Sequence, residues 1–256
     1  MDEVSAAARQ LAGRERILVF TGAGISTESG IPDFRGPNGL WKTVDPAEFT
    51  IQHYVGDPDF RRRAWERRFG STLLRDAVPN DAHRAVARLW QSGRVTGVVT
   101  QNIDGLQQRA GIPAAAVAEL HGNAFGLVCY GCGDRPHPEA VEERWRAGEA
   151  DPSCERCEGI LKSTTVMFGE DLPADDFERA SHWASTADAA IAVGTTLSVY
   201  PAALIPLEVA QRGEPFVIVN EGRTDHDNWA TARLEGRAGS LLPPLVDSVL
   251  DGSLQP

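Results

Sequence analysis

The chain has 256 residues, of which 42% are hydrophobic and 24% are charged, a composition that excludes intrinsic disorder, collagen and small disulfide scaffolds. Its 25 Lys and Arg residues against 36 Asp and Glu residues give a formal net charge of −11, which repels phosphate backbones; we therefore expect no intrinsic nucleic-acid binding, and a basic partner is easier to accommodate. The N-terminus lacks the basic start and apolar core of a secretion signal, and no stretch approaches the roughly 20 apolar residues of a membrane span, so we expect a cytoplasmic protein without membrane contact.

Four short apolar runs predict the strands of the fold. Their hydrophobicity is continuous rather than alternating, which is typical of strands buried on both faces of a parallel sheet. The runs cover residues 17–20, 95–99, 189–193 and 216–219. An amphipathic segment over 81–90, capped by Asn80 and Asp81, predicts a helix between the first two runs. This alternation of strand and helix predicts an α/β fold.

Small or polar residues follow each of the four runs. Because ligands of open α/β sheets lie outside the carboxyl ends of the strands, we expect these loops to meet at one crevice. The loops are Thr21-Gly22-Ala23-Gly24, Thr100-Gln101-Asn102-Ile103-Asp104, Gly194-Thr195-Thr196 and Asn220-Glu221-Gly222.

The first of these loops is a candidate phosphate-binding turn. Gly22 to Ser26 directly follows a strand and would expose backbone N–H groups to a pyrophosphate. Thr27 stands where the dinucleotide fingerprint has its third glycine, so a plain strand-to-helix turn remains an alternative on this fragment. The string that continues to Gly36 contains Arg35, whose charged fork suits a phosphate.

Two insertions separate the strand-forming parts. Residues 36–79 are rich in Pro, Arg and aromatic residues, and residues 122–165 hold all four cysteines of the chain. Neither insertion has enough apolar residues for an independent core, so we expect both to form lobes packed on the sheet domain.

The cysteines form two Cys-x-x-Cys pairs, Cys129 with Cys132 and Cys154 with Cys157. Two such knuckles can bring four thiolates to one tetrahedral ion, so we expect one structural zinc rather than a redox pair or a disulfide. Four protein ligands close the coordination sphere, which assigns the zinc to folding and not to chemistry.

Among six histidines, His121 is the candidate for chemistry. It follows Val117-Ala118-Glu119-Leu120 and opens a glycine turn at a strand end, a place where loops carry function, although a structural imidazole is the alternative. His83 lies on the predicted helix. The others, in polar or loop contexts, are expected to be solvated: His53, His137, His182 and His226.

Several strings together resemble the sirtuins, the NAD-dependent protein deacylases, from about residue 17 to 244. They are Gly22 to Ser26, Gly30 to Arg35, Thr100 to Asp104, His121-Gly122, the paired cysteines, Phe168-Gly169-Glu170, Gly194 to Leu197, and Val219-Asn220. The resemblance implies a single catalytic domain over 1–256, with a Rossmann-like NAD-binding part over 14–35, 80–121 and 166–250. Residues 36–79 would form a helical insertion and residues 122–165 a zinc-binding lobe.

The resemblance also implies the site residues. NAD and an acylated lysine of a protein substrate would enter one cleft from opposite sides. The expected NAD contacts are Gly22, Ala23, Gly24, Ser26, Phe34, Arg35, Gln101, Asn102, Ile103, Asp104, Gly194, Thr195, Thr196, Asn220, Glu221, Gly222 and Ala238. The expected peptide contacts are Val166, Phe168, Gly169, Glu170, Ser198, Val199 and Tyr200.

The catalytic roles implied by the resemblance fall on His121, Asn102 and Asp104. His121 would act as the general base that activates a ribose hydroxyl, after the acyl oxygen of the substrate has displaced nicotinamide. Asp104 would accept hydrogen bonds from the nicotinamide amide. A mono-ADP-ribosyltransferase on the same scaffold and a catalytically silent NAD-sensing module are the alternatives.

Three features depart from the family pattern, the last of them a pair of positions. Gln107 stands where the family usually has histidine, and Thr196 replaces the commoner serine. Members specialised for succinyl or malonyl lysine carry a Tyr and an Arg three residues apart, where this chain has Arg68 and Ser71. We therefore expect a preference for acetyl-lysine, with Arg68 and its neighbouring arginines on a solvated helix face.

Overall fold

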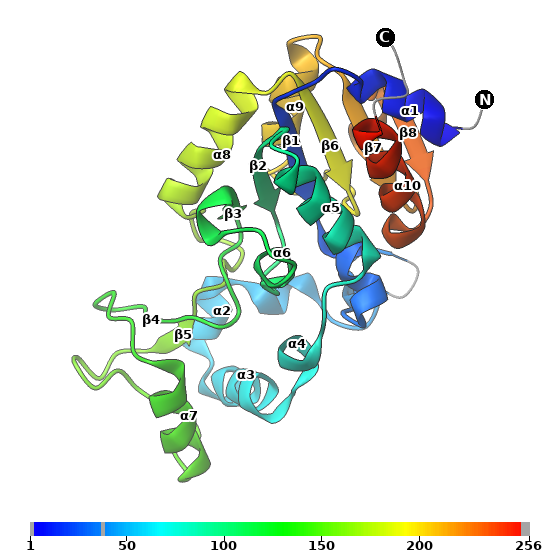
Figure 1. The fold of residues 1–256 in the computed structure, drawn as a ribbon. Helices are drawn as coiled ribbons and strands as arrows, with labels where there is room; N and C mark the ends of the chain where they lie inside the picture. Colours follow the sequence, from blue (N-terminus) through cyan, green and yellow to red (C-terminus); the bar gives the residue numbers. More distant parts are fainter. Residues whose placement is uncertain (1–2, 37–38, 252–256) are drawn as a thin grey trace.

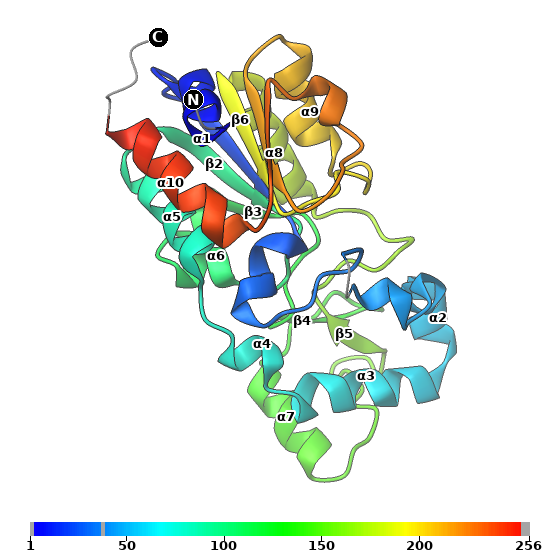
Figure 2. The same cartoon turned by 90° about the vertical axis from the view of Figure 1, so that its right-hand side faces the viewer.

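The structure is a computed structural model that describes residues 3–36 and 39–251. It contains one large sheet domain and, below it in Figures 1 and 2, a smaller part that holds the two insertions. Both ends of the described chain, at residues 3 and 251, lie in the sheet domain, away from the smaller part (Figure 1).

Six parallel strands form the large sheet in the order β3-β2-β1-β6-β7-β8. Numbered along the chain, these strands have the order 3-2-1-4-5-6 of a Rossmann fold. The order in which strands are added to the sheet reverses between β1 and β6, although the two strands are parallel. The strands are β1 Ile17–Thr21, β2 Val95–Thr100, β3 Val117–Glu119, β6 Ala189–Val193, β7 Phe216–Asn220 and β8 Ala232–Glu235. All four predicted strands are confirmed.

Helices cover both faces of this sheet. One face packs on α1 (Glu3–Leu11), α5 (Asp81–Gln91) and α10 (Ala238–Leu250). The other packs on α8 (Ala174–Thr186) and α9 (Leu204–Gln211). The predicted helix over 81–90 is confirmed as α5. The side chain of Asn80 caps it by accepting hydrogen bonds from the N–H groups of Ala82 and His83.

The smaller part contains the insertions. The first forms the 3-10 turns Leu40–Lys42 and Pro46–Phe49 and the helices α2 (Ile51–Gly56), α3 (Pro58–Gly70) and α4 (Leu73–Asp76). The second forms β4 (Leu127–Cys129), α7 (Pro138–Arg146) and β5 (Leu161–Ser163), with β4 and β5 antiparallel.

The two insertions share one small core rather than packing separately on the sheet domain. Trp65 and Phe69 of α3 stack at 5.4 Å and bury themselves against Leu127, Leu161 and the thiol-bearing Cys129. The guanidinium of Arg61 binds Asp151 across the two insertions. Each insertion thus supplies the apolar surface that the other lacks.

Candidate functional site

A large cavity lies where the carboxyl ends of the strands face the smaller part. Its volume is about 1760 Å³, well above the roughly 300–1,000 Å³ of a site for one small ligand. Every residue that the sequence predicts to contact NAD or peptide lines this cavity, except Ser198. The hydroxyl of Ser198 instead lies 2.8 Å from that of Thr196. His121 also lines the cavity.

The floor of the cavity is built where the loops after β1 and β6 meet. The N–H of Gly22 donates to Val193 at 3.0 Å, and the N–H of Gly24 donates to Gly194 at 2.8 Å. Gly194 has φ +62°, and a Cβ there would lie 2.2 Å from the backbone nitrogen of Ile25. Only glycine allows this approach, so backbone rather than side chains forms the floor.

The helix expected after the glycine turn is a 3-10 helix, Ala23–Ser29. It ends at Gly30, which has φ 84° and whose N–H binds the last carbonyls of the turn. Thr27, in place of the third glycine of the fingerprint, is exposed. The predicted turn is therefore present, but it opens a short tight helix.

Three buried polar side chains form a network in the cavity wall. The hydroxyl of Ser26 donates to Asp104 Oδ2 at 2.7 Å, and Asn102 Nδ2 donates to the Ser26 hydroxyl at 3.1 Å. Asp104 Oδ1 accepts the N–H of Leu106 at 2.9 Å. These contacts fix the orientation of the Asp104 carboxylate.

His83, to which the sequence assigns only a place on a helix, reaches this network. Its Nε2 lies 3.5 Å from the Ser26 hydroxyl, and the side chain is fully buried. Burial lowers the pKa of His83 to about 4, and the nearby Asp104 carboxylate opposes that shift. His83 is therefore neutral at physiological pH. Its position at the cap of α5 was the only local signal.

The ring of His121 is held in one tautomer. Its Nδ1 lies 3.0 Å from the carbonyl oxygen of Gln101, and since a carbonyl only accepts hydrogen bonds, Nδ1 carries the proton. Nε2 of the neutral ring is then free to accept a proton. Burial lowers the pKa of His121, while the hydrogen bond to Gln101 raises it, and the net shift is downward.

The segment that contains Phe168 lies beside the first insertion. The N–H of Phe168 donates to Phe49 and its carbonyl accepts from Ile51, each at 3.0 Å. Trp41 packs its ring 5.0 Å from Phe34 and 6.3 Å from Phe168. Trp41 and Phe49 line the cavity. Neither residue was predicted to line the site, although the aromatic content of residues 36–79 was a signal.

Tyr200 forms the opposite edge, and 56% of its surface is exposed. Its hydroxyl lies 3.2 Å from Nε2 of His226. His226 is buried, so the expectation that it is solvated is wrong, because the loop after β7 folds its ring under Tyr200. Gln107 is buried outside the cavity lining and donates to the hydroxyl of Thr21 at 3.3 Å.

Arg68 and Ser71 both line the cavity, but the Arg68 guanidinium is already engaged. Its Nη2 donates to the carbonyl of Phe125 at 2.7 Å, and its Nη1 donates to the carbonyl of Ala124. The expectation of a solvated arginine face is wrong for Arg68 and for the buried Arg61, because both tie α3 to other segments.

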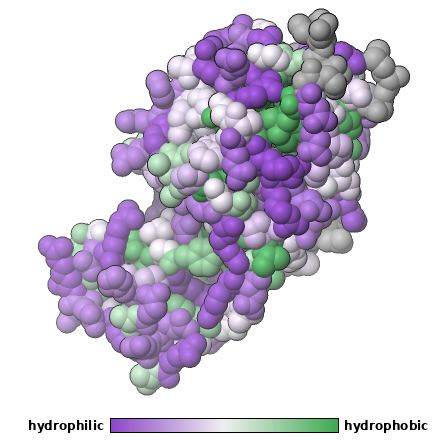
Figure 3. Space-filling view, in the orientation of Figure 1, coloured by the Kyte–Doolittle hydropathy of each residue, from purple (hydrophilic) through white to green (hydrophobic). Residues whose placement is uncertain are grey.

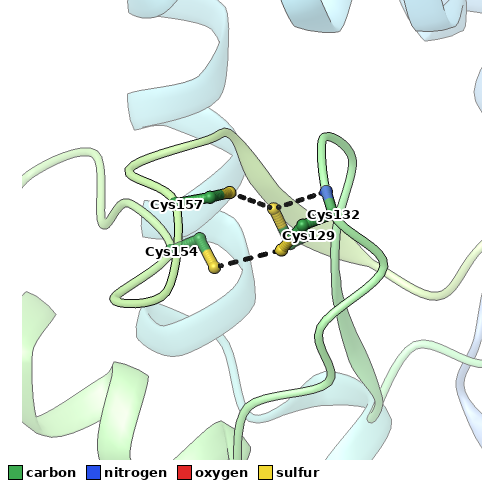
Figure 4. A group of neighbouring side chains, drawn as sticks. All are labelled: Cys129, Cys132, Cys154 and Cys157. Atoms are coloured by element: carbon green, nitrogen blue, oxygen red, sulfur yellow. Dashed lines mark hydrogen bonds between the residues drawn. The ribbon is translucent and has the colours of Figure 1, made fainter.

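The four cysteines form a compact cluster in the smaller part (Figure 4). All four sulfur atoms lie within 4.8 Å of one another. The Sγ atoms of Cys129 and Cys157 are 3.5 Å apart, and those of Cys132 and Cys154 are 3.8 Å apart. These distances are too long for a disulfide, and they match the roughly 3.8 Å edge of a tetrahedron with Zn–S bonds of about 2.3 Å. None of the four lines the cavity among the described residues.

The sequence profile that describes the Sir2 family matches residues 22–201. The chain belongs to the Sir2 family. This Sir2 chain is 45% identical to the NAD-dependent protein deacetylase 2 of Streptomyces coelicolor, over 92% of its own length and 98% of the relative's. It is 41% identical to the NAD-dependent protein deacetylase 1 of Pyrobaculum aerophilum, over 96% and 94% of the two chains.

Solved structures agree with this family. A chain described as showing the structural basis for the mechanism and regulation of Sir2 enzymes matches with a TM-score of 0.86 and 40% identity, over 97% of this Sir2 chain and 98% of that chain. A complex described as Sir2, p53 peptide and NAD+ matches with a TM-score of 0.83 and 34% identity, over 96% and 97%. In the described part of the Sir2 chain, no helix is long and apolar enough to cross a membrane.

Proposed function

We propose that this Sir2 chain is an NAD-dependent protein lysine deacetylase. It would remove acyl groups, most simply acetyl, from lysine side chains of proteins and transfer them to ADP-ribose. The observation that carries the proposal is the position of His121. A neutral imidazole with a free Nε2 lines the same cavity as the glycine loops of the Rossmann sheet. The deacetylase names of the relatives support it.

The residues of the cavity fit NAD. The glycine floor between β1 and β6 lies at the reversal point of the sheet, where Rossmann folds take dinucleotides, and Arg35 adds a positive charge beside it. When bound, NAD supplies an electrophilic ribose carbon with nicotinamide as its leaving group. Asp104, held by Ser26 and Leu106, would accept hydrogen bonds from the nicotinamide amide. Asn102 would face the ribose, and Asn220 and Ala238 the adenosine half.

His121 would take the proton of a ribose hydroxyl at Nε2. The lowered pKa keeps the ring neutral at physiological pH, so that the base is ready before the reaction. As the ring becomes positively charged, the carbonyl of Gln101 stabilises the Nδ1 proton. The same hydrogen bond would hold the ring in its orientation.

A peptide would bind as an added strand between residues 166–170 and 198–200. Main-chain pairing of this kind places little demand on the substrate sequence, and it needs only the backbone of Ser198, whose side chain is turned to Thr196. Arg68, whose Nη1 and Nη2 are tied to the carbonyls of Ala124 and Phe125, would not turn to an acidic acyl group without breaking these contacts. This supports a preference for acetyl-lysine over succinyl-lysine.

The cysteine cluster fits one structural zinc, held by Cys129, Cys132, Cys154 and Cys157. None of these described cysteines lines the cavity, so the zinc would take no part in the reaction. The division into a Rossmann-like part over 14–35, 80–121 and 166–250, a helical insertion over 36–79 and a zinc lobe over 122–165 is likewise our proposal. The cytoplasmic location and the lack of nucleic-acid binding stay predictions.

One assay tests the function. The purified protein is incubated with NAD and an acetyl-lysine peptide, and all products are identified and quantified by mass spectrometry. Free lysine peptide, nicotinamide and acetyl-ADP-ribose in equal amounts support the proposal. A protein or peptide that gains ADP-ribose instead would favour the transferase. No release of nicotinamide under any acyl-lysine peptide would leave an NAD-sensing module.

A further inference from the structure

Lys162, on β5, is one of the few charged side chains that the structure buries. Only 3% of its surface is exposed. Its Nζ forms an ion pair with Oε2 of Glu170 at 3.0 Å and donates to the carbonyl of Thr165 at 2.8 Å. Removing an ammonium group from water is costly unless it is paired and hydrogen-bonded, so both contacts are needed to keep it there.

Lys162 joins the two ends of a short segment, residues 165–170. Lys162 holds the carbonyl of Thr165 at the start of the segment, and Glu170 is its last residue. Oε2 of Glu170 also accepts the N–H of Met167 at 2.8 Å. The Glu170 side chain therefore folds back onto its own segment, where it organises the backbone instead of facing a ligand.

This segment is packed between the two sides of the cavity. On one side, the N–H of Val166 donates to the carbonyl of His121 at 2.8 Å. The contact there is so close that a Cβ on Gly122 would lie 1.9 Å from the carbonyl oxygen of Thr164. On the other side, Phe168 pairs with the backbone of the first insertion. A shift of the segment would therefore displace both the peptide edge and the turn that carries His121.

We propose that Lys162 and Glu170 are positioning residues for substrate binding, which set the backbone of residues 165–170 in the shape that receives the acyl-lysine peptide. This inference rests on the proposed deacetylase function. It assigns to Lys162 a role in peptide affinity, although Lys162 is not among the residues that line the cavity. Most of the expected NAD contacts lie in the loops after β1, β6 and β7, and in the described chain these loops share no hydrogen bond with residues 165–170, so NAD affinity should change far less than peptide affinity.

The test uses the full chain with its metal. In Lys162→Met, a side chain of similar length loses its charge, and in Lys162→Arg the charge returns. Peptide affinity is measured by fluorescence anisotropy of a labelled acetyl-lysine peptide, and NAD affinity by calorimetry. Arg94→Met is the matched control, because Arg94 also donates to three backbone carbonyls, those of Leu11, Arg14 and Val249, but lies away from the cavity.

We expect Lys162→Met to raise the peptide Kd about tenfold or more, since a charge-assisted hydrogen bond and an ion pair are lost together. The NAD Kd should stay within about twofold, and Lys162→Arg should bring the peptide Kd back to within about threefold of the wild type. In turnover, KM for the peptide should rise more than kcat falls. Arg94→Met should lower the melting temperature without changing the peptide Kd.

Two results would overturn the proposal. One is a Lys162→Met protein that melts earlier but binds peptide as tightly as the wild type, which would make the pair purely structural. The other is an equal loss of peptide and NAD affinity. If Lys162→Met does not fold, Glu170→Ala breaks the same ion pair, together with the hydrogen bond from the Met167 N–H, and must show the same peptide-selective loss. Because affinity is measured without turnover, a wild type that binds both ligands but deacetylates nothing would refute the function and leave this test intact.

Discussion

Replacing His121 separates a base from a merely structural imidazole. The His121→Ala substitution removes the proton acceptor and one hydrogen bond, the one between Nδ1 and the carbonyl of Gln101. In His121→Gln, the side-chain amide can still donate to that carbonyl but cannot act as a base. The pair of variants therefore tests the acceptor and the hydrogen bond independently.

The structure predicts very different magnitudes for stability and for rate. Losing one hydrogen bond costs about 0.5–1.5 kcal/mol of stability, so the variants should stay folded. A general base contributes about 10²–10⁴-fold to the rate, equivalent to roughly 2.7–5.4 kcal/mol of barrier at 1.36 kcal/mol per tenfold change. Both variants should lose at least 10²-fold in kcat/KM, roughly equally.

The assay is acetyl-lysine peptide turnover across pH, with melting temperature and NAD affinity as controls for folding. The active form of His121 is neutral, and burial puts its pKa below the ordinary value of about 6.5. Activity due to this group should thus fall as the pH drops, with its half-maximal point on the acid side of pH 6.5. The exposed His182 of α8 is the matched control, and His182→Ala should match the wild type.

A near wild-type rate in either His121 variant would remove this residue as the base. An acid limb that persists unchanged in His121→Gln would assign the titration to another group.

Four further outcomes are expected. Metal analysis should find one zinc per chain. Because such sites bind zinc with an apparent free energy of about 10–16 kcal/mol, strong chelation or Cys154→Ala should unfold the shared core of the two insertions. Active, thiol-reduced protein without zinc would contradict this. Acetyl-lysine peptides should exceed succinyl-lysine peptides in kcat/KM by at least about tenfold, because Arg68 is tied to two carbonyls and a carboxylate left unpaired beside it would cost several kcal/mol. Equal values on matched peptides would show that Arg68 releases its carbonyls to bind the acid. Asp104→Asn should lower turnover at least about 10²-fold in a folded protein, and unchanged nicotinamide release would remove Asp104 from the site. The pKa of His83 is about 4 in the folded chain and about 6.5 in the unfolded chain. As the pH falls from 6.5 to 4, only the unfolded chain therefore takes up this proton, which should lower the stability by on the order of 3 kcal/mol. Urea unfolding at pH 7 and pH 5 should show a smaller loss of stability for His83→Gln than for the wild type.

The composition of the chain predicts a mostly polar surface, but it does not predict where apolar residues gather on that surface. Figure 3 shows hydrophilic residues over most of one face, with apolar residues in small patches, some of them at the junction between the sheet domain and the smaller part. The acidic balance of the chain is visible in the sequence. Which apolar residues face the junction is decided only when residues distant in sequence, such as Trp41 and Phe168, come together.

The sequence by itself determined the central strands, the cap of α5, the glycine turn and the two cysteine knuckles. Each of these is a local feature: a strand buried on both faces leaves an unbroken apolar run, and a cap or a metal ligand pair needs a fixed short spacing. β8 was missed because it lies at the edge of the sheet, where only one of its four residues, Leu234, is buried. Its pattern is therefore not distinguishable from a loop.

Only the tertiary structure decided which polar groups meet. Arg61 and Asp151 are 90 positions apart, and no spacing rule joins them, so an arginine-rich helix reads as a solvated face. Lys162 gave no signal in the sequence either. Its role follows from being buried beside Glu170, next to the turn of His121. The free energy of a charge depends on the dielectric and the partners around it, and these are properties of the folded chain and not of any short stretch of sequence.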